Sequence, residues 1–195
     1  MDGFERRRQE KKEAICYAAL ELFKQYGFNK VSIADIANKA SVSQVSIYNF
    51  FKSKENLKKQ LLNKLWNNYY QTMMSIMKSD ETIQNKIEKF FFTAVDYSRN
   101  YTTNFIAESV RNQMKNEENA TVIQLDSIED VLISLLEQGK SEGVIKSTIS
   151  TNAMISYIEM FRYYIINNPG AALNYDKNPE LLKEMISLYL NALLI

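Results

Sequence analysis

Apolar residues recur at helical spacing along most of the 195-residue chain. Near the N-terminus, Ile15, Ala18 and Leu22 follow one another three and four positions apart, and this pattern predicts an amphipathic helix over residues 5–26. Gly27 then follows as a C-cap. The first structural element is therefore expected to be a long helix with one buried face.

Serine residues mark the starts of two short helices after this one. Ser32 is followed three residues later by Asp35, as in a capping box, and Ser43 precedes a second short segment over residues 44–50. In that segment Ile47 and Phe51 are expected to face inward. A long helix is predicted next, over residues 54–77.

The rest of the chain has the same helical periodicity. Asp80 is the expected cap of the next helix, and Asn178 followed by Pro179 predicts the start of the last one. The pattern predicts five further helices, over residues 80–99, 103–114, 120–141, 151–167 and 179–195. With about nine helices and only 5 Gly and 2 Pro, the sequence predicts an all-α fold.

Composition removes several kinds of chemistry. The chain has no histidine, the commonest general base and metal ligand, and a single cysteine, Cys16. We therefore expect no metal site, no cofactor, no disulfide framework and no enzymatic activity. The charged N-terminus does not resemble a secretory signal, and no run of 18 apolar residues suggests a membrane span. The expected location is the cytoplasm.

Charge is distributed unevenly along the chain. Residues 1–60 contain 12 Lys and Arg against 7 Asp and Glu, whereas residues 61–195 contain 12 against 16. This asymmetry favours contact between the N-terminal part and a polyanion, although a chance distribution over solvated faces would give the same counts.

Two short helices joined by a tight turn after a longer helix form a helix-turn-helix pattern. In that motif the second short helix lies in the major groove of DNA. Its expected base-facing residues are Gln44, Val45, Ser46 and Asn49, while Tyr48, Lys52 and Lys54 are placed to reach phosphates. The alternative is a solvated helix face in a protein that binds no nucleic acid.

Three stretches of the sequence carry a resemblance to a known family. They are residues 15–27, the run Val-Ser-Ile-Ala-Asp-Ile-Ala at 31–37, and the run Val-Ser-Gln-Val-Ser-Ile-Tyr-Asn-Phe-Phe-Lys-Ser-Lys-Glu-Asn-Leu at 42–57. Together they closely resemble the DNA-binding domain of TetR-family regulators. Residue by residue, the resemblance implies DNA-facing roles for Ser32, Ser43, Gln44, Val45, Ser46, Tyr48, Asn49 and Lys54.

The resemblance also implies the overall organisation. A three-helix DNA-binding domain over residues 1–53 would precede a helical ligand-binding and dimerising domain over residues 54–195. Family members are usually repressors that a small molecule releases from a twofold-symmetric, double-stranded DNA operator. Three departures are Val45, where the family usually has Gly or Ala, Ser41, where it often has Gly, and Val31, where it often has Thr.

The C-terminal part is interpreted from its residues. The segments 151–167 and 179–195 are apolar on most sides, which predicts a homodimer formed through the last two helices, or else two central helices of a monomer. Aromatic and methionine side chains are candidates to line an effector pocket, unless they are ordinary core. These candidates, with one acidic residue, are Phe92, Tyr97, Tyr101, Phe105, Glu108, Met160 and Tyr164. A helical carrier or enzyme without a DNA-binding role remains the competing hypothesis.

Overall fold

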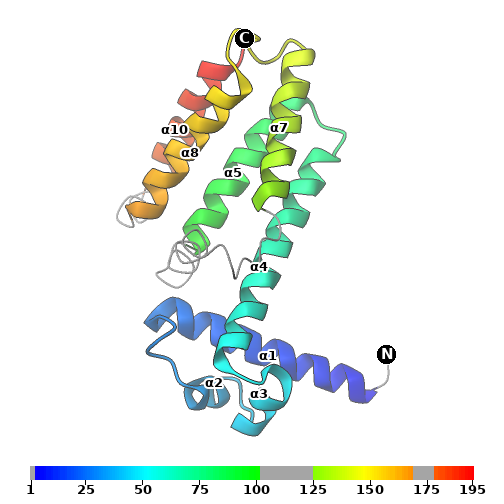
Figure 1. Cartoon of the computed structure of the whole chain (residues 1–195), viewed down its shortest axis with the longest axis vertical. Helices are drawn as coiled ribbons and strands as arrows, with labels where there is room; N and C mark the ends of the chain where they lie inside the picture. Colours follow the sequence, from blue (N-terminus) through cyan, green and yellow to red (C-terminus); the bar gives the residue numbers. More distant parts are fainter. Residues whose placement is uncertain (1–2, 102–124, 169–177) are drawn as a thin grey trace. The chain divides into compact units, whose positions relative to one another are not determined.

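The computed structural model describes residues 3–101, 125–168 and 178–195 (Figure 1). Within these ranges the chain forms eight α-helices and no β-strand beyond one isolated bridge. The helices are α1 (Gly3–Tyr26), α2 (Ile33–Lys39), α3 (Gln44–Phe51), α4 (Lys54–Met77), α5 (Ile83–Tyr101), α7 (Leu125–Ser141), α8 (Thr151–Asn167) and α10 (Pro179–Leu193). The predicted all-helical class is confirmed. The helix expected over residues 103–114 lies outside the described residues.

The described helices form two compact units. Unit 1 contains residues 3–65 and unit 2 contains residues 66–101, 125–168 and 178–195, so that α4 contributes to both. The predicted functional boundary between residues 53 and 54 stays a prediction.

Unit 1 is built on the amphipathic pattern of α1. Ile15 and Phe23 are fully buried, and α1 packs against α2, which packs against α3. The helix ends where Gly27 adopts a φ of +81° and its N–H donates to the carbonyl of Phe23 at 3.0 Å. A side chain would strain that left-handed backbone, so the glycine terminates α1 as predicted.

Serine caps fix the two short helices of unit 1. Ser32 and Asp35 form the predicted capping box of α2, and Ser43 caps α3 by accepting from the N–H of Ser46. Ser41, in the turn between these helices, has a φ of +54°, a left-handed conformation that is costly for a residue with a side chain. The two helices therefore start and stop at positions set by local chemistry.

Unit 2 is held together by one apolar core. Its α5 packs against α7, α8 and α10, and the buried Ile87, Leu135 and Met154 come from three of these helices. The backbone of α7 at Gly139 lies very close to the Ile145 side chain. A Cβ added to Gly139 would be only 2.6 Å from the Ile145 Cδ1. Glycine is therefore the residue that allows this contact.

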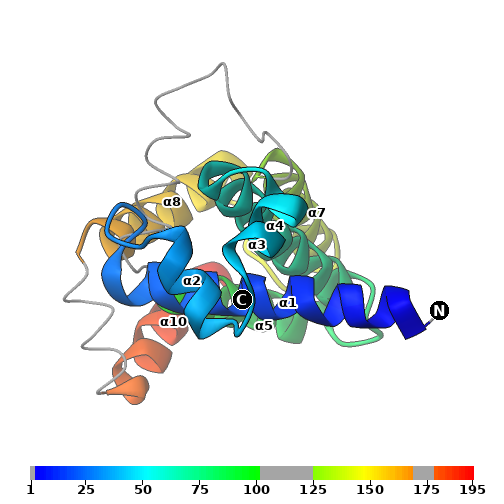
Figure 2. The same cartoon turned by 90° about the horizontal axis from the view of Figure 1, so that it is seen from below.

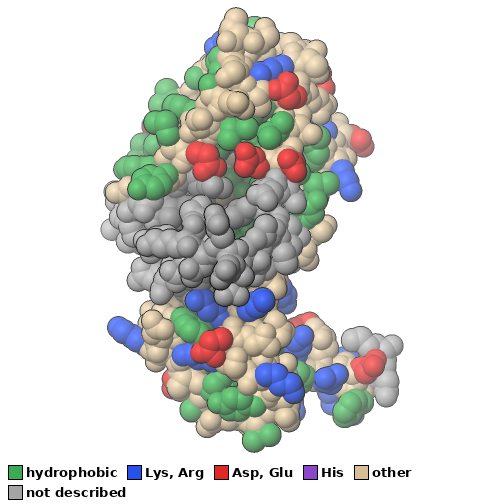
Figure 3. All heavy atoms as spheres, viewed as in Figure 1, with side chains coloured by type: hydrophobic (Ala, Val, Ile, Leu, Met, Phe, Trp, Pro, Cys, Tyr) green, Lys and Arg blue, Asp and Glu red, His purple; other side chains and the backbone are tan. Residues whose placement is uncertain are grey.

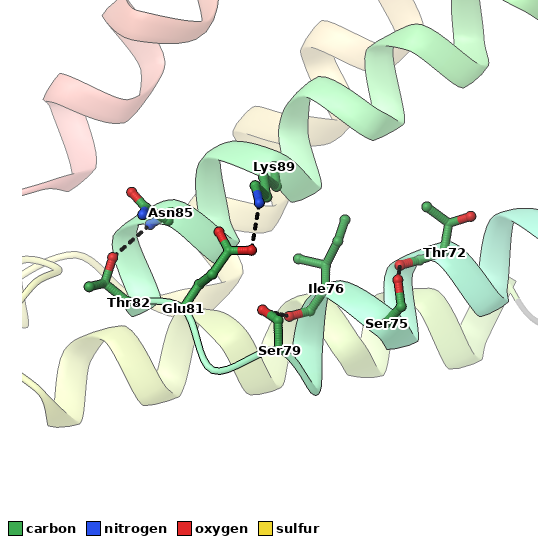
Figure 4. A network of polar contacts seen from close by, with 8 residues as sticks. All are labelled: Thr72, Ser75, Ile76, Ser79, Glu81, Thr82, Asn85 and Lys89. Carbon is green, nitrogen blue, oxygen red and sulfur yellow. Dashed lines mark hydrogen bonds and ion pairs between the residues drawn. The ribbon is translucent and has the colours of Figure 1, made fainter.

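The connection between α4 and α5 differs from the prediction at its cap (Figure 4). The Thr82 hydroxyl accepts from the N–H of Asn85 at 3.3 Å, and α5 begins at Ile83. The expectation that Asp80 caps this helix was wrong, because Asp80 lies too far before the first helical turn. Nearby, Glu81 forms an ion pair with Lys89 at 2.5 Å. Because this pair is largely exposed, it contributes little to stability.

The last helix begins as predicted and ends early. Asn178 caps α10 by accepting from the N–H of Leu181, and Pro179 occupies the first turn. The predicted continuation to Ile195 was wrong, because Leu194 is extended and bridges to Ile145. The N–H of Ile195 donates to the carbonyl of Val144 at 3.0 Å, so these last residues bond to the segment after α7.

Candidate nucleic-acid interface

Helix α3 has one buried and one exposed face. Ile47 and Phe51 are 1% and 0% exposed, which confirms the prediction that they face inward. On the other side Val45 is 66% exposed and Tyr48 is 48% exposed. Gln44 and Asn49 are exposed as well. The helix therefore offers solvent a surface of one carboxamide pair, one small apolar side chain and one phenol.

The first turn of α3 is arranged by its two serines. The Ser43 hydroxyl accepts from the N–H of Ser46 at 3.2 Å and lies 2.9 Å from the Ser46 hydroxyl. The hydroxyls satisfy one another and one of the N–H groups that a helix start leaves without a partner. Their role in unit 1 is to define where the helix begins, and with it the positions of Gln44 and Val45.

Ser32 plays the same part at the start of α2. Its N–H and hydroxyl both donate to the Asp35 carboxylate, at 2.8 and 2.7 Å, and its hydroxyl oxygen accepts from the N–H of Asp35. The hydrogen bonds from Ser32 hold the pKa of the Asp35 carboxyl below its usual value. The Ser32 side chain is exposed but already engaged in this cap.

Lys54 is tied to the loop between α1 and α2. Its Nζ donates to the carbonyls of Phe28 and Val31 at 3.1 and 2.9 Å, and lies 4.3 Å from the centre of the Phe28 ring. The ammonium group has three N–H donors, so these bonds use two of them. Any phosphate contact by Lys54 would have to share the ammonium with these carbonyls, and the predicted contact stays a prediction.

A tight turn joins α3 to α4. Lys52 has a φ of +67° and a ψ of −40°, and the N–H of Ser53 donates to the carbonyl of Phe51 at 2.8 Å. This is a γ-turn in its strained form, with an exposed lysine at the centre. Strain of this kind persists where the surrounding structure fixes it, and here it sets the direction in which the chain leaves α3.

Basic side chains lie on aromatic rings around the base of α3. The Arg8 guanidinium is 5.6 Å from the centre of the Phe50 ring, and the Lys12 ammonium is 5.9 Å from that of Phe51. Lys and Arg side chains gather over unit 1 in Figure 3. These long-range contacts were missed in the sequence, because residues some 40 positions apart share no local pattern.

Of the proposed effector-pocket residues that the structure describes, one is half-buried and three are exposed. Tyr97 is half-buried on α5, with its ring 4.6 Å from Tyr69, whereas Met160 and Tyr164 are 68% and 48% exposed on α8. Phe92 is 38% exposed. Phe105 and Glu108 lie outside the described residues, as does the side chain of Tyr101. The predicted pocket therefore stays a prediction.

A different aromatic group extends from the core of unit 2 to its surface, since Phe91 and Tyr189 are buried and Tyr157 is exposed. The Tyr189 ring lies 4.5 Å from Phe91 and stacks on Tyr157 at 5.0 Å. Burial raises the pKa of the Tyr189 phenol well above its usual value, and its hydroxyl donates to the Met154 carbonyl. The phenol thus serves this site as a hydrogen-bond donor.

Helices α8 and α10 leave large apolar side chains exposed. Their exposed fractions are 51% for Tyr157, 70% for Tyr163 and 70% for Leu188. Figure 3 shows hydrophobic side chains gathered on the side where these two helices lie in Figure 1. Apolar patches of this kind mark sites of association.

Other chemistry is sparse in the described part of the chain. No group of three His, Cys, Asp or Glu residues there is arranged to hold a metal ion, and none of its helices has the length and apolar character to cross a bilayer. Burial raises the pKa of the Cys16 thiol above its ordinary value. A half-buried thiol in that state is a poor nucleophile at neutral pH.

Comparisons with known proteins give a family match in the N-terminal part of the chain. Residues 15–61 match the family model described as bacterial regulatory proteins, tetR family. The chain is 28% identical over 103 residues to the probable HTH-type transcriptional regulator YttP of Bacillus subtilis, covering 51% of this chain and 50% of that protein. The chain therefore matches about half the length of YttP.

Two further matches extend over nearly the whole chain. The HTH-type transcriptional repressor KstR2 of Rhodococcus jostii is 22% identical over 182 residues, covering 90% of this chain and 87% of that one. The structure of the ketosteroid transcriptional regulator KstR2 of Mycobacterium tuberculosis superposes with a TM-score of 0.64 at 17% identity, covering 97% and 95% of the two chains. At this identity the superposition shows a shared fold.

Proposed function

Because the chain is a member of the TetR family of bacterial transcriptional regulators, we propose that it represses transcription by binding a twofold-symmetric operator as a dimer. The observation that carries this proposal is the exposed face of α3, held in place by the buried Ile47 and Phe51. Such a regulator acts where the chromosome is, in the cytoplasm.

The proposed contacts fall into two kinds. Gln44 and Asn49 carry carboxamides that can bond the N6 and N7 edge of adenine, and Val45 offers a methyl surface to thymine. Tyr48 and Lys54 are assigned to phosphates, which set position without reading sequence. Ser32, Ser43 and Ser46 lie at the starts of α2 and α3. Besides forming the caps, their hydroxyls and the neighbouring N–H groups are proposed to face the phosphate backbone of DNA.

The first experiment selects bound duplexes from a random pool with the natural protein. We expect a recovered site with two half-sites about 10 base pairs apart, because paired recognition helices must meet successive major grooves. Recovery of an asymmetric site would contradict the proposal that a dimer binds the operator. Failure to enrich any duplex at low salt would contradict DNA binding itself.

Substitutions on α3 test its role in reading the site. Gln44→Ala is expected to cost about 1–3 kcal/mol on the selected duplex and to leave binding to a scrambled duplex unchanged. Tyr48→Phe is expected to weaken both complexes equally. Gln25→Ala, an exposed glutamine in the last turn of α1, is the matched control. Equal losses on both duplexes for Gln44→Ala would refute base reading by this residue.

Dimerisation is proposed to use the exposed apolar surface of α8 and α10. Tyr163→Glu puts a charge on a side chain that is 70% exposed on α8, and it is expected to give monomers in sedimentation equilibrium. Tyr17→Glu makes the same change at a tyrosine that is 68% exposed on α1, and it should leave the dimer intact. If both variants stay dimeric, α8 is not in the interface.

The effector is proposed to be a small apolar or amphipathic molecule that binds in the C-terminal unit. A ligand releases the operator only if it binds the DNA-free arrangement better than the DNA-bound one. Reciprocity then requires operator DNA to weaken ligand binding by the same factor. Titration of a compound with and without the selected duplex measures this coupling, and equal affinities would show that the compound is not an inducer.

A further inference from the structure

The first three turns of α1 carry a basic face. Arg7, Arg8, Lys11 and Lys12 are spaced one and four positions apart, so they share one side of the helix, named here the α1 basic face. The same spacing continues to Ile15, which is fully buried. The stripe that packs into unit 1 in the second half of α1 is therefore replaced by cations in the first half.

Two contacts show which way this face points. The guanidinium of Arg8 lies over Phe50 and the ammonium of Lys12 lies over Phe51, at the end of α3. Figures 1 and 2 both show the first turns of α1 extending beyond α3 within this unit. The α1 basic face therefore lies on the side of α1 that faces α3, and it continues along α1 beyond α3.

Two of the three acidic residues in these turns, Glu10 and Glu13, bond to residues outside the basic face, whereas Glu5 lies beside that face, three positions before Arg8. Arg6 forms an ion pair with Glu10 at 3.5 Å, and Gln9 donates to Glu13 at 2.7 Å. Neither contact involves Arg7, Arg8, Lys11 or Lys12. Arg7 and Lys11 are exposed and one helical turn apart, a spacing of about 6 Å along the axis. That distance is close to the rise of two nucleotides along one strand.

We propose that the α1 basic face binds phosphates of double-stranded DNA that flank the bases facing α3, and so extends the bound site beyond the recognition helix. Charge complementarity argues for the DNA backbone as the occupant, because four cations face one way and the polyanion is the partner already assigned to α3. This inference rests on the proposed function and adds a second element to its binding surface.

The test compares two variants with the same loss of charge. Arg7→Gln/Lys11→Gln removes two cations from the α1 basic face, while Arg8 and Lys12 keep their ring contacts. Arg6→Gln/Lys24→Gln removes two cations from α1 outside that face. The probe is the duplex that the natural protein selects from a random pool, and the measurement is the slope of log affinity against log salt concentration.

Each phosphate contact contributes about 0.9 to that slope. We expect the Arg7/Lys11 variant to lower its magnitude by about 1.8 per bound subunit and to shorten the hydroxyl-radical footprint at both outer edges. The control is expected to keep the natural slope and footprint. Equal slopes for all three proteins, or equal reductions in both variants, would overturn the inference while leaving the proposed function standing. Absence of binding by the natural protein would overturn both.

Discussion

Lys54 provides the sharpest prediction about what holds unit 1 together. Its Nζ donates to the carbonyls of Phe28 and Val31 and lies 4.3 Å from the Phe28 ring centre, so it joins the start of α4 to the loop before α2. A hydrogen bond from a charged donor contributes about 1.5–3 kcal/mol, and a cation–π contact adds about 0.5–1 kcal/mol at exposed sites. Because Lys54 is half-buried, we take the low end of these ranges. Two such bonds and one ring contact at the low end come to about 3.5 kcal/mol, so Lys54→Met should destabilise unit 1 by about 3–4 kcal/mol.

Native-state hydrogen exchange at the amides of α2 and α3 measures this free energy without DNA. Lys59→Met, which removes an exposed lysine from the same helix, is the control and should change stability by less than about 0.5 kcal/mol. If Lys54→Met is as stable as the control, the carbonyl contacts do not hold the unit together. A phosphate contact through the third N–H would appear separately, as a salt slope reduced by about 0.9 per subunit.

Three further predictions concern single positions. Asp35→Asn should destabilise α2 at neutral pH. Folding lowers the pKa of the Asp35 carboxyl, so this group stabilises the folded state above its unfolded pKa of about 4, and the effect of the substitution should disappear as the pH falls below that range. A destabilisation that does not change with pH would contradict this. Ser41→Gly should raise stability by about 0.5–1 kcal/mol by relieving its left-handed φ, with hydrogen exchange as the measure; a loss would contradict strain at this turn. Gly139→Ala should lower the free energy of unfolding by about 1–3 kcal/mol, measured by thermal unfolding, because its Cβ would collide with Ile145. In a chain that already carries Ile145→Ala, the same glycine substitution should cause no further loss. Losses that simply add in the double variant would contradict the close contact.

Features governed by neighbouring residues were predictable from the sequence. The caps at Ser32, Ser43 and Asn178 each depend on a side chain and an N–H three residues later, and all three are present. The orientation of α3 followed from the spacing of Ile47 and Phe51. Local chemistry and helical periodicity thus determine most of unit 1.

Features governed by distant residues were not predictable in this way. The carbonyl partners of Lys54 are 26 and 23 positions away, so no local pattern distinguishes a lysine that binds phosphate from one that joins a loop. The end of α10 depends on pairing between Leu194 and Ile145. The cap of α5 was predicted wrongly because Asp80 and Thr82 both carry an oxygen that can accept from the first turn of a helix. Thr82 is the residue that directly precedes the helix, and its hydroxyl accepts from the N–H of Asn85.

The central claim is that the exposed face of α3 lies against base edges in the major groove. The most direct measurement replaces individual purines of the selected duplex with 7-deaza analogues, which remove the N7 acceptor from the major groove only, and compares them with 3-deazaadenine, which alters only the minor groove. We expect 7-deaza substitution to weaken binding at symmetric positions in both half-sites, and 3-deaza substitution there to have no effect. Sensitivity confined to the minor-groove analogue would contradict the account.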